Sequence, residues 1–186
     1  CVVRLKGGDP FLFGRGSEEA EWLIQHNIHV EVVPGITAGM AAPTYMGIPL
    51  THRESASSVT FVTGHEGKKK RGPSVNWRKV ANASDGIVIY MGIHNLHYII
   101  DELIAGGLDP ETPSAIIHQG TLVNQQFIKA PLNKLLRKQR SRGIESPSII
   151  VIGKVINHQI EQGAPTPSDL RLSELKTLTA LVGSQS

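Results

Sequence analysis

The sequence predicts an α/β protein of two domains, and three observations lead to that prediction. Short apolar segments rich in Val and Ile recur along the chain and are bounded by Gly or Pro, as buried strands are. Segments with apolar residues at helical spacing lie between them. Hydrophobic residues make up 40% of the 186 residues and charged residues 19%, which is ordinary for a globular protein. The alternation of strand and helix is typical of an α/β fold.

The first 35 residues have the pattern strand, loop, helix, strand. Residues 2–5 are apolar apart from one Arg and predict the first strand, and residues 30–33 predict the second. Between these segments, Ser17 is a typical helix N-cap. It is followed by Glu18 and Glu19, which suit the electropositive first turn of a helix. We therefore expect a parallel β-α-β unit here.

A second helix is predicted over residues 37–46, which are rich in Ala and Gly, and Pro43 either kinks it or begins it. The polar stretch THRESASS follows and predicts a linker between domains. We expect the C-terminal part of a first domain plus linker over residues 1–55, a second domain over 56–162 and a tail over 163–186.

The second domain repeats the alternation of strands and helices. Its predicted strands are short runs of β-branched and other apolar residues, at positions 59–62, 87–90, 114–117, 126–129 and 149–152. One helix is predicted by the apolar stripe over residues 96–103. A second, basic helix is predicted over residues 132–138. This second domain is expected to hold all of its own strands.

The composition excludes several classes of function. The 19 Lys and Arg residues exceed the 16 Asp and Glu residues by three, which suits an acidic ligand but is too small to indicate nucleic-acid binding. No segment approaches the roughly 18 apolar residues of a membrane span. The single cysteine, Cys1, excludes an internal disulfide framework and is compatible with a reducing cytosol. Because the chain begins with Cys, we expect it to be a piece of a longer protein.

Small residues follow several of the predicted strands. The loop Gly7-Gly8-Asp9-Pro10 comes directly after the first strand, where open α/β sheets bind their ligands. Its glycines let a ligand approach the main chain, although a tight turn without a ligand is the alternative. The loop is neither a Walker A loop nor a G-x-G-x-x-G motif. Thr37-Ala38, Met91-Gly92 and Gln119-Gly120 have a similar context, and the four loops together favour a ligand between two domains.

The remaining polar clusters point to no further chemistry. His94 and His97 are three apart on a predicted helix, but no carboxylate completes a metal-binding pattern, so no metal is expected. The basic residues 68–71 form either a solvated loop or a clasp for acidic groups. No Ser-His-acid triad and no pair of catalytic carboxylates can be assigned from spacing.

Three motifs carry a family resemblance. The segments VVRLKGGDPFLFGRGSEE, VPGITAGMAAPTYMGIPLTHR and IYMG closely resemble the uroporphyrinogen-III C-methyltransferases of the tetrapyrrole methylase family, from residue 2 to about residue 160. Related precorrin methylases tend to carry His in place of Lys6 and continue with an SGDPSLYG-like sequence. Diphthine synthase has a different continuation after its Gly-Asp-Pro. The resemblance therefore implies uroporphyrinogen III as the substrate.

The resemblance implies two α/β domains with S-adenosylmethionine in the cleft between them, the first domain being incomplete in this chain. It implies a set of cofactor-binding residues at the strand ends noted above: Gly7, Gly8, Asp9, Leu12, Thr37, Ala38, Met91 and Gly120. Arg15 is implied as a substrate residue, because an Arg suits a ring system that bears carboxylates. Arg53, next to His52, is a further substrate candidate.

The implied reaction is methylation of uroporphyrinogen III at C-2 and then C-7, which gives precorrin-2 and S-adenosylhomocysteine in the siroheme, cobalamin or haem d1 branch. The family resemblance also implies a cytoplasmic homodimer. Its proline-glycine loop and its proton-handling residues are expected upstream of this chain, so the catalytic residues are unknown. The alternatives are an inactive cofactor-binding fragment, a methylase of a later precorrin, and a fragment that self-associates through an exposed sheet edge.

Overall fold

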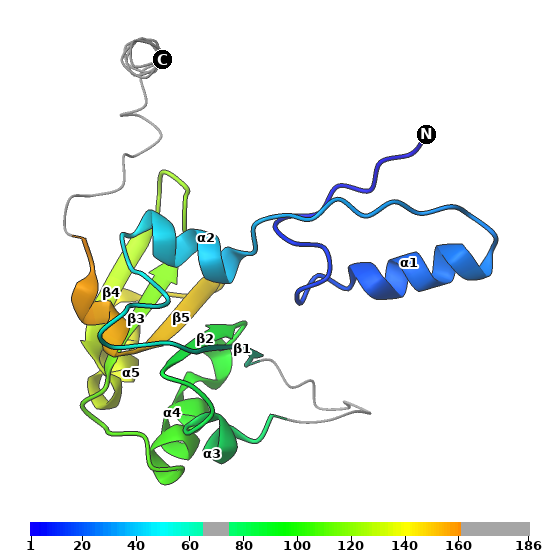
Figure 1. Ribbon diagram of the computed structural model, residues 1–186. Helices are drawn as coiled ribbons and strands as arrows, with labels where there is room; N and C mark the ends of the chain where they lie inside the picture. Colours follow the sequence, from blue (N-terminus) through cyan, green and yellow to red (C-terminus); the bar gives the residue numbers. More distant parts are fainter. Residues whose placement is uncertain (65–74, 161–186) are drawn as a thin grey trace, which may run out of the picture.

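The computed structural model describes residues 1–64 and 75–160 (Figure 1). The basic residues 68–71 and the predicted tail lie outside the described residues. The elements are α1 (Gly16–Gln25), α2 (Ala38–Tyr45), β1 (Val59–Thr63), α3 (Trp77–Val80), β2 (Gly86–Tyr90), η1 (Ile93–Asn95), α4 (Leu96–Ala105), β3 (Pro113–His118), β4 (Gln126–Pro131), α5 (Leu132–Arg142), β5 (Ser148–Gly153) and η2 (Lys154–His158). Within the described ranges, no helix is both long and apolar enough to cross a membrane.

The five strands form one mixed sheet in the order β1-β2-β5-β3-β4. This confirms the predicted α/β class, and each of the five strands predicted after residue 58 is present. Only β1 and β2 are parallel, whereas β5 runs antiparallel to both β2 and β3, and β3 runs antiparallel to β4. The sheet is therefore mixed. The short connection between β3 and β4 allows only an antiparallel pair, because a parallel crossover needs a dozen or more residues.

Both faces of the sheet are buried. Along β2, Ile87 and Ile89 face one hydrophobic cluster, which includes residues of α3, α4 and α5. Val88 and Tyr90 face the other cluster, which includes residues of α2 and η2. Figure 1 shows α2 on one side of the sheet and α3 to α5 on the other. Since side chains alternate along a strand, this arrangement directs Tyr90 at α2.

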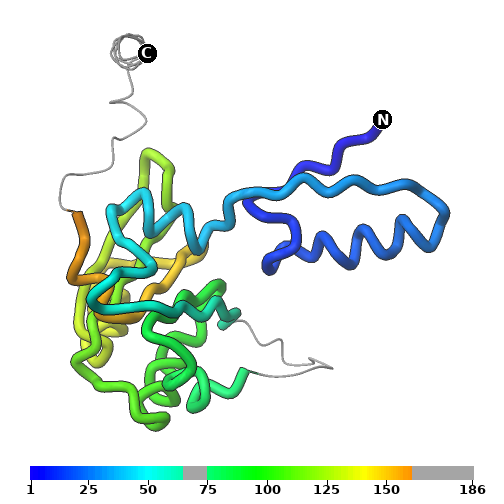
Figure 2. The backbone as a smooth tube through the Cα atoms, in the orientation of Figure 1, coloured from blue at the N-terminus to red at the C-terminus, as the bar shows by residue number. Residues whose placement is uncertain are grey.

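The two strands predicted in the first 35 residues are absent. Residues 2–5 and 30–33 are extended, but no strand is formed there, and Val2 and Leu5 are 97% and 84% exposed. Figure 2 shows residues 1–36, which include α1, running to one side of the sheet. The prediction was wrong because apolar β-branched residues make a strand only where a neighbouring strand supplies hydrogen bonds. In the described part of the chain, no such neighbour lies beside them.

The structure decides two details of the first helices. Helix α1 begins at Gly16 with Arg15, not Ser17, at the N-cap. The Gly16 N–H donates to the Pro10 carbonyl at 2.9 Å, and this turn draws the helix start back toward the loop. Pro43 lies inside α2, so of the two predicted positions the helix start is excluded. Helix α2 precedes the predicted domain boundary near residue 55 but packs on the sheet that follows it, and the boundary itself stays a prediction.

Candidate functional site

The first glycine loop is held together by the Asp9 carboxylate. Its Oδ1 accepts hydrogen bonds from the N–H groups of Phe11 at 2.9 Å and Leu12 at 3.1 Å. Its Oδ2 accepts a bond from the Gly35 N–H at 3.2 Å. These bonds favour the ionised form and hold the pKa of Asp9 below its ordinary value, with the bond from Phe11 as the largest cause. The carboxylate thus links the first loop to the turn before the second.

We expect Asp9→Asn to loosen this link, because an amide nitrogen cannot accept a bond from the Gly35 N–H. The lowered pKa sets the pH dependence of the wild type. The link is complete above the ordinary pKa of aspartate and is lost as the pH falls through the lowered value. In an NMR titration, the Gly35 amide should show an acid transition in the wild type and none in Asp9→Asn.

The matched control is Asp85→Asn. Asp85 also has a lowered pKa, chiefly because its carboxylate accepts a hydrogen bond from the Ser58 hydroxyl, and it lies far from Gly35 in the sequence. This variant should leave the titration of the Gly35 amide unchanged. An identical acid transition in the wild type and in Asp9→Asn would contradict the role given to Asp9.

The first loop lies directly against the second. Gly8 has a φ of 90°, and a Cβ built on it would lie 3.3 Å from the Ile36 carbonyl oxygen, 3.6 Å from Thr37 Cα and 3.7 Å from the Ala38 nitrogen. A side chain at Gly8 would therefore be both strained and crowded. A Cβ built on Gly7 would meet no atom within 4 Å. The loop thus presents one glycine to Thr37-Ala38 and one to open space.

The second loop is tied to the sheet through Tyr90. The Thr37 Oγ1 and the Tyr90 Oη are 2.7 Å apart, and the Gly39 N–H donates to the same Tyr90 oxygen at 2.9 Å. Met91 follows Tyr90 directly and is exposed. A Cβ built on Gly120 would lie 2.6 Å from the Ala42 Cβ of α2. The predicted cofactor residues from the four loops therefore gather around α2 and its N-terminal end.

Backbone strain marks the same region. Phe13, Met91 and Gln119 have φ values of 54°, 53° and 47°, which non-glycine residues adopt at a cost of about 1–3 kcal/mol. Phe13 packs its ring against Tyr90, with the centroids 4.8 Å apart. Leu12 packs against the hydrophobic cluster that joins α2 to the sheet. Such conformations persist where the surrounding structure holds them, and they cluster at ligand sites.

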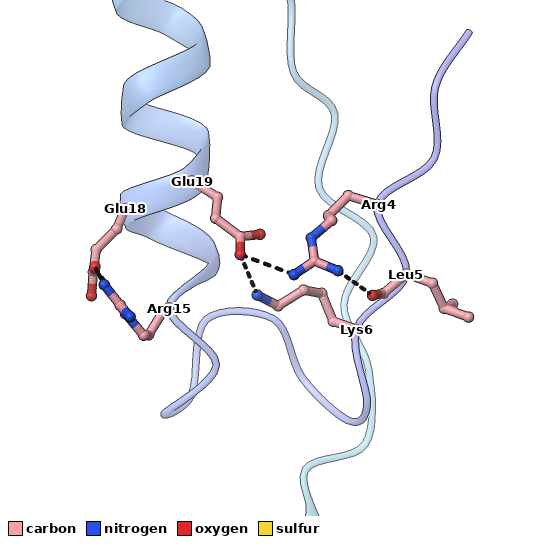
Figure 3. Close-up of polar contacts among 6 residues, drawn as sticks. All are labelled: Arg4, Leu5, Lys6, Arg15, Glu18 and Glu19. Atoms are coloured by element: carbon pink, nitrogen blue, oxygen red, sulfur yellow. Dashed lines mark hydrogen bonds and ion pairs between the residues drawn. The ribbon is translucent and has the colours of Figure 1, made fainter.

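Arg15 lies apart from this group, beside α1. Its Nε and Nη2 donate to Glu18 Oε2 at 3.0 and 2.7 Å, which raises the pKa of Arg15 and lowers that of Glu18 (Figure 3). Arg4 and Lys6 both reach Glu19 Oε1, at 3.3 and 3.0 Å (Figure 3). These five charged side chains line a pocket of about 840 Å³, together with Val2, Gly14, Trp22 and Leu23.

Arg53 is not brought to Arg15 by any contact found among the described residues. It is exposed, in the turn where His52 and Ala56 form an isolated β-bridge. The ring of His52 stacks on that of His158, with the centroids 3.5 Å apart. The roles predicted for Arg15, Arg53 and the eight cofactor residues stay predictions.

The contacts of two residues of the site could not be predicted from the motifs that contain them. Tyr90 holds the second loop, and although it lies in the IYMG motif at the end of β2, nothing in that motif indicates a contact with Thr37 or Gly39. Glu18 is the partner of Arg15, and the spacing of three residues in a predicted helix is a weak signal for that pair. Within the described ranges, no group of three His, Cys, Asp or Glu side chains is placed to hold a metal ion.

Comparisons with known proteins find relatives of similar sequence. The chain is 53% identical over 157 residues to a uroporphyrinogen-III C-methyltransferase of Synechocystis sp., and the match covers 84% of this chain and 60% of that protein. It is 47% identical over 156 residues to the Priestia megaterium protein of the same name, covering 84% of this chain and 65% of that protein. It therefore spans about three fifths to two thirds of the length of these curated relatives.

A solved structure is similar as well. The uroporphyrin-III C-methyl transferase from Thermus thermophilus, complexed with S-adenosyl homocysteine, matches at a TM-score of 0.71 and 33% identity over 84% of this chain and 67% of that chain. Residues 1–136 match the sequence profile of the Tetrapyrrole (Corrin/Porphyrin) Methylases. That range contains all four loops and α2, and the chain belongs to the tetrapyrrole (corrin/porphyrin) methylase family.

Proposed function

We propose that this chain supplies the cofactor cleft of an S-adenosylmethionine-dependent enzyme that methylates uroporphyrinogen III at C-2 and C-7 and gives precorrin-2. The observation that carries the proposal is the gathering of the four loops around α2, where Gly8 lies against Thr37 and Ala38. The names of the relatives suggest the reaction: one is a uroporphyrinogen-III C-methyltransferase, and a solved relative is complexed with S-adenosyl homocysteine.

The residues present fit such a cofactor. Gly7 leaves main-chain groups open, and the exposed side chain of Met91 offers an apolar contact. The proposed cofactor-binding residues are Gly7, Gly8, Asp9, Leu12, Thr37, Ala38, Met91 and Gly120. Asp9 acts by shaping the loop, because both of its oxygens already accept main-chain hydrogen bonds. When bound, S-adenosylmethionine supplies an electrophilic methyl group on a sulfonium.

The protein's own contribution is alignment. Holding the methyl donor and the pyrrole carbon in line can contribute at most about 7–11 kcal/mol to catalysis. The electron-rich ring carbon is the nucleophile, so no covalent bond to a protein side chain is required. Arg15 is proposed to bind a substrate carboxylate, for which its planar guanidinium is well shaped. Glu18 already holds that guanidinium in place, and Arg53 is proposed as a second contact.

Arg15→Ala should weaken the binding of uroporphyrinogen III about tenfold, the worth of one charge-assisted contact. The affinity for S-adenosylhomocysteine should stay within about threefold, because the Arg15 guanidinium pairs with Glu18 of α1 rather than with a residue of the glycine loops. Anaerobic titration with uroporphyrinogen III and calorimetric titration with S-adenosylhomocysteine measure the two affinities.

Arg78→Ala is the matched control for Arg15→Ala. Arg78 forms a similar two-bond pair with Glu102, at 3.0 Å for each bond, between α3 and α4. Its loss should change neither affinity. Equal losses of both ligands in Arg15→Ala would contradict the assignment of Arg15 to the substrate.

The experiment that tests the proposal itself is calorimetric titration of the chain with S-adenosylhomocysteine, followed by an assay of methyl transfer to uroporphyrinogen III. A chain that binds the product but transfers no methyl group would be a cofactor-binding fragment, an alternative favoured by its partial coverage of the relatives. Transfer to a later precorrin alone would favour that substrate class. A homodimer in the cytoplasm is also proposed, and sedimentation velocity tests the dimer.

A further inference from the structure

Helix α2 lacks a cap of its own at the end that carries the proposed cofactor residues. Its N-cap residue, Thr37, makes no side-chain hydrogen bond to the first turn of the helix. The N–H groups of a first helical turn need partners from outside the helix. Here the Gly39 N–H donates to the Tyr90 hydroxyl at 2.9 Å, and the Thr37 hydroxyl lies 2.7 Å from the same oxygen. The cap is therefore supplied by a side chain of β2.

The position of the Tyr90 hydroxyl is closely defined. Tyr90 is the last residue of β2 and is only 7% exposed. Its backbone is paired on both sides, with Thr63 of β1 and Ile149 of β5. Its ring contacts those of Phe13 and Phe61, at centroid distances of 4.8 and 6.3 Å. Strand pairing and ring packing together leave the side chain little freedom to move.

The Tyr90 side chain also lies in close contact with α2. A Cβ built on Gly39 would overlap the Tyr90 hydroxyl, so this turn of the helix can approach the ring only with glycine at that position. The Tyr90 side chain joins three segments: its ring contacts Phe13, just beyond the first loop, its hydroxyl contacts Thr37 of the second loop, and its backbone belongs to the sheet. Each of these segments carries residues of the proposed cofactor site.

We propose that Tyr90 is a positioning residue, whose hydroxyl fixes the main chain of Thr37-Ala38 and thereby sets the affinity for the cofactor. The inference rests on the proposed function, since it takes S-adenosylmethionine as the ligand of this loop. Tyr90 acts through Thr37 and Gly39 rather than by touching the cofactor. Phenylalanine at this position would keep the ring packing but would leave the Gly39 N–H without its partner.

The experiment is a calorimetric titration of the 186-residue chain with S-adenosylhomocysteine. Tyr90→Phe should weaken binding about tenfold, the effect of losing one or two buried hydrogen bonds. Thr37→Val should cause a similar loss, whereas Thr37→Ser keeps the hydroxyl and should bind within about twofold of the wild type. The double variant should be no more than about twofold weaker than Tyr90→Phe, because both changes break the same link.

The control is Tyr98→Phe, which removes an exposed hydroxyl from α4 and should leave the affinity unchanged. A merely structural role for Tyr90 would lower the melting temperature and leave the affinity at its wild-type value, and that result would overturn the inference. Full additivity in the double variant would also overturn it. If Tyr90→Phe does not fold, equal affinities of Thr37→Val and Thr37→Ser would overturn it.

Failure of the inference and failure of the proposed function give different results. A wild-type chain that does not bind S-adenosylhomocysteine overturns the proposed function and the inference with it. A wild-type chain that binds, alongside a Tyr90→Phe variant that binds equally well, overturns the inference alone.

Discussion

Gly8→Val should weaken the binding of S-adenosylhomocysteine at least about a hundredfold, which corresponds to roughly 2.7 kcal/mol. Two effects act together at this position. The φ of 90° is a conformation that a β-branched residue adopts only under strain, at a cost of about 1–3 kcal/mol. The new side chain would also press on the Ile36 carbonyl oxygen and on the main chain of Thr37. The two loops would therefore separate at the point where the cofactor is proposed to lie.

Gly107→Val is the control for Gly8→Val, because it introduces backbone strain without steric crowding. Gly107 has a φ of 101°, but a Cβ built on it would meet no atom within 4 Å, and it lies just beyond the end of α4. This variant should lose stability and keep its affinity for S-adenosylhomocysteine. In both variants, circular dichroism should retain the signal of the folded sheet. Wild-type affinity in Gly8→Val would show that the contact between the loops does not matter for binding.

Hydrogen exchange should divide the chain sharply into two parts. Amides of β2 and β5, in the centre of the sheet, should exchange more slowly than those of residues 2–5 by about four orders of magnitude, or roughly 5 kcal/mol. The central strands are paired on both sides and almost fully buried. Residues 2–5 have no ladder partner among the described residues, and the same expectation holds for residues 30–33.

Mass spectrometry of labelled peptides measures this contrast, and dilution supplies its control. Protection at residues 2–5 that disappears on dilution would mean that copies of the chain pair along these segments, as an exposed strand edge allows. Protection at residues 2–5 that does not change with concentration would contradict the prediction. It would mean that these segments have hydrogen-bonded partners within one chain.

The local pattern of apolar residues in the sequence predicted the strands after residue 58 well. Each strand from β1 to β5 was placed within two residues at either end, because its apolar β-branched residues are buried in the folded sheet. The same pattern misled at residues 2–5, where equally apolar residues stay exposed. The residues are of the same type in both places, and the difference is the presence of a neighbouring strand.

The candidate site was likewise predictable from the sequence only in part. The four glycine-containing or small-residue loops are recognisable from their place after predicted strands, and the family resemblance drawn from their motifs is confirmed by the match over residues 1–136. Their mutual contacts are not recognisable, since Gly8 meets Thr37 and Gly120 meets Ala42 across long stretches of chain. The spacing of three residues makes an ion pair between Arg15 and Glu18 possible in a helix. A motif alone, however, does not say with which acidic residue an exposed arginine pairs.

The sequence by itself determined the α/β class, the order of the five strands and of α4 and α5 after residue 58, and the loops that carry the family motifs. These depend on periodicity and on glycine, which act over a few residues. The tertiary structure alone decided the strand order, the antiparallel course of β5, and the use of the Tyr90 hydroxyl as the cap of α2. Each of these joins residues distant in the chain, and such contacts are selected by packing of the whole sheet rather than by any local pattern.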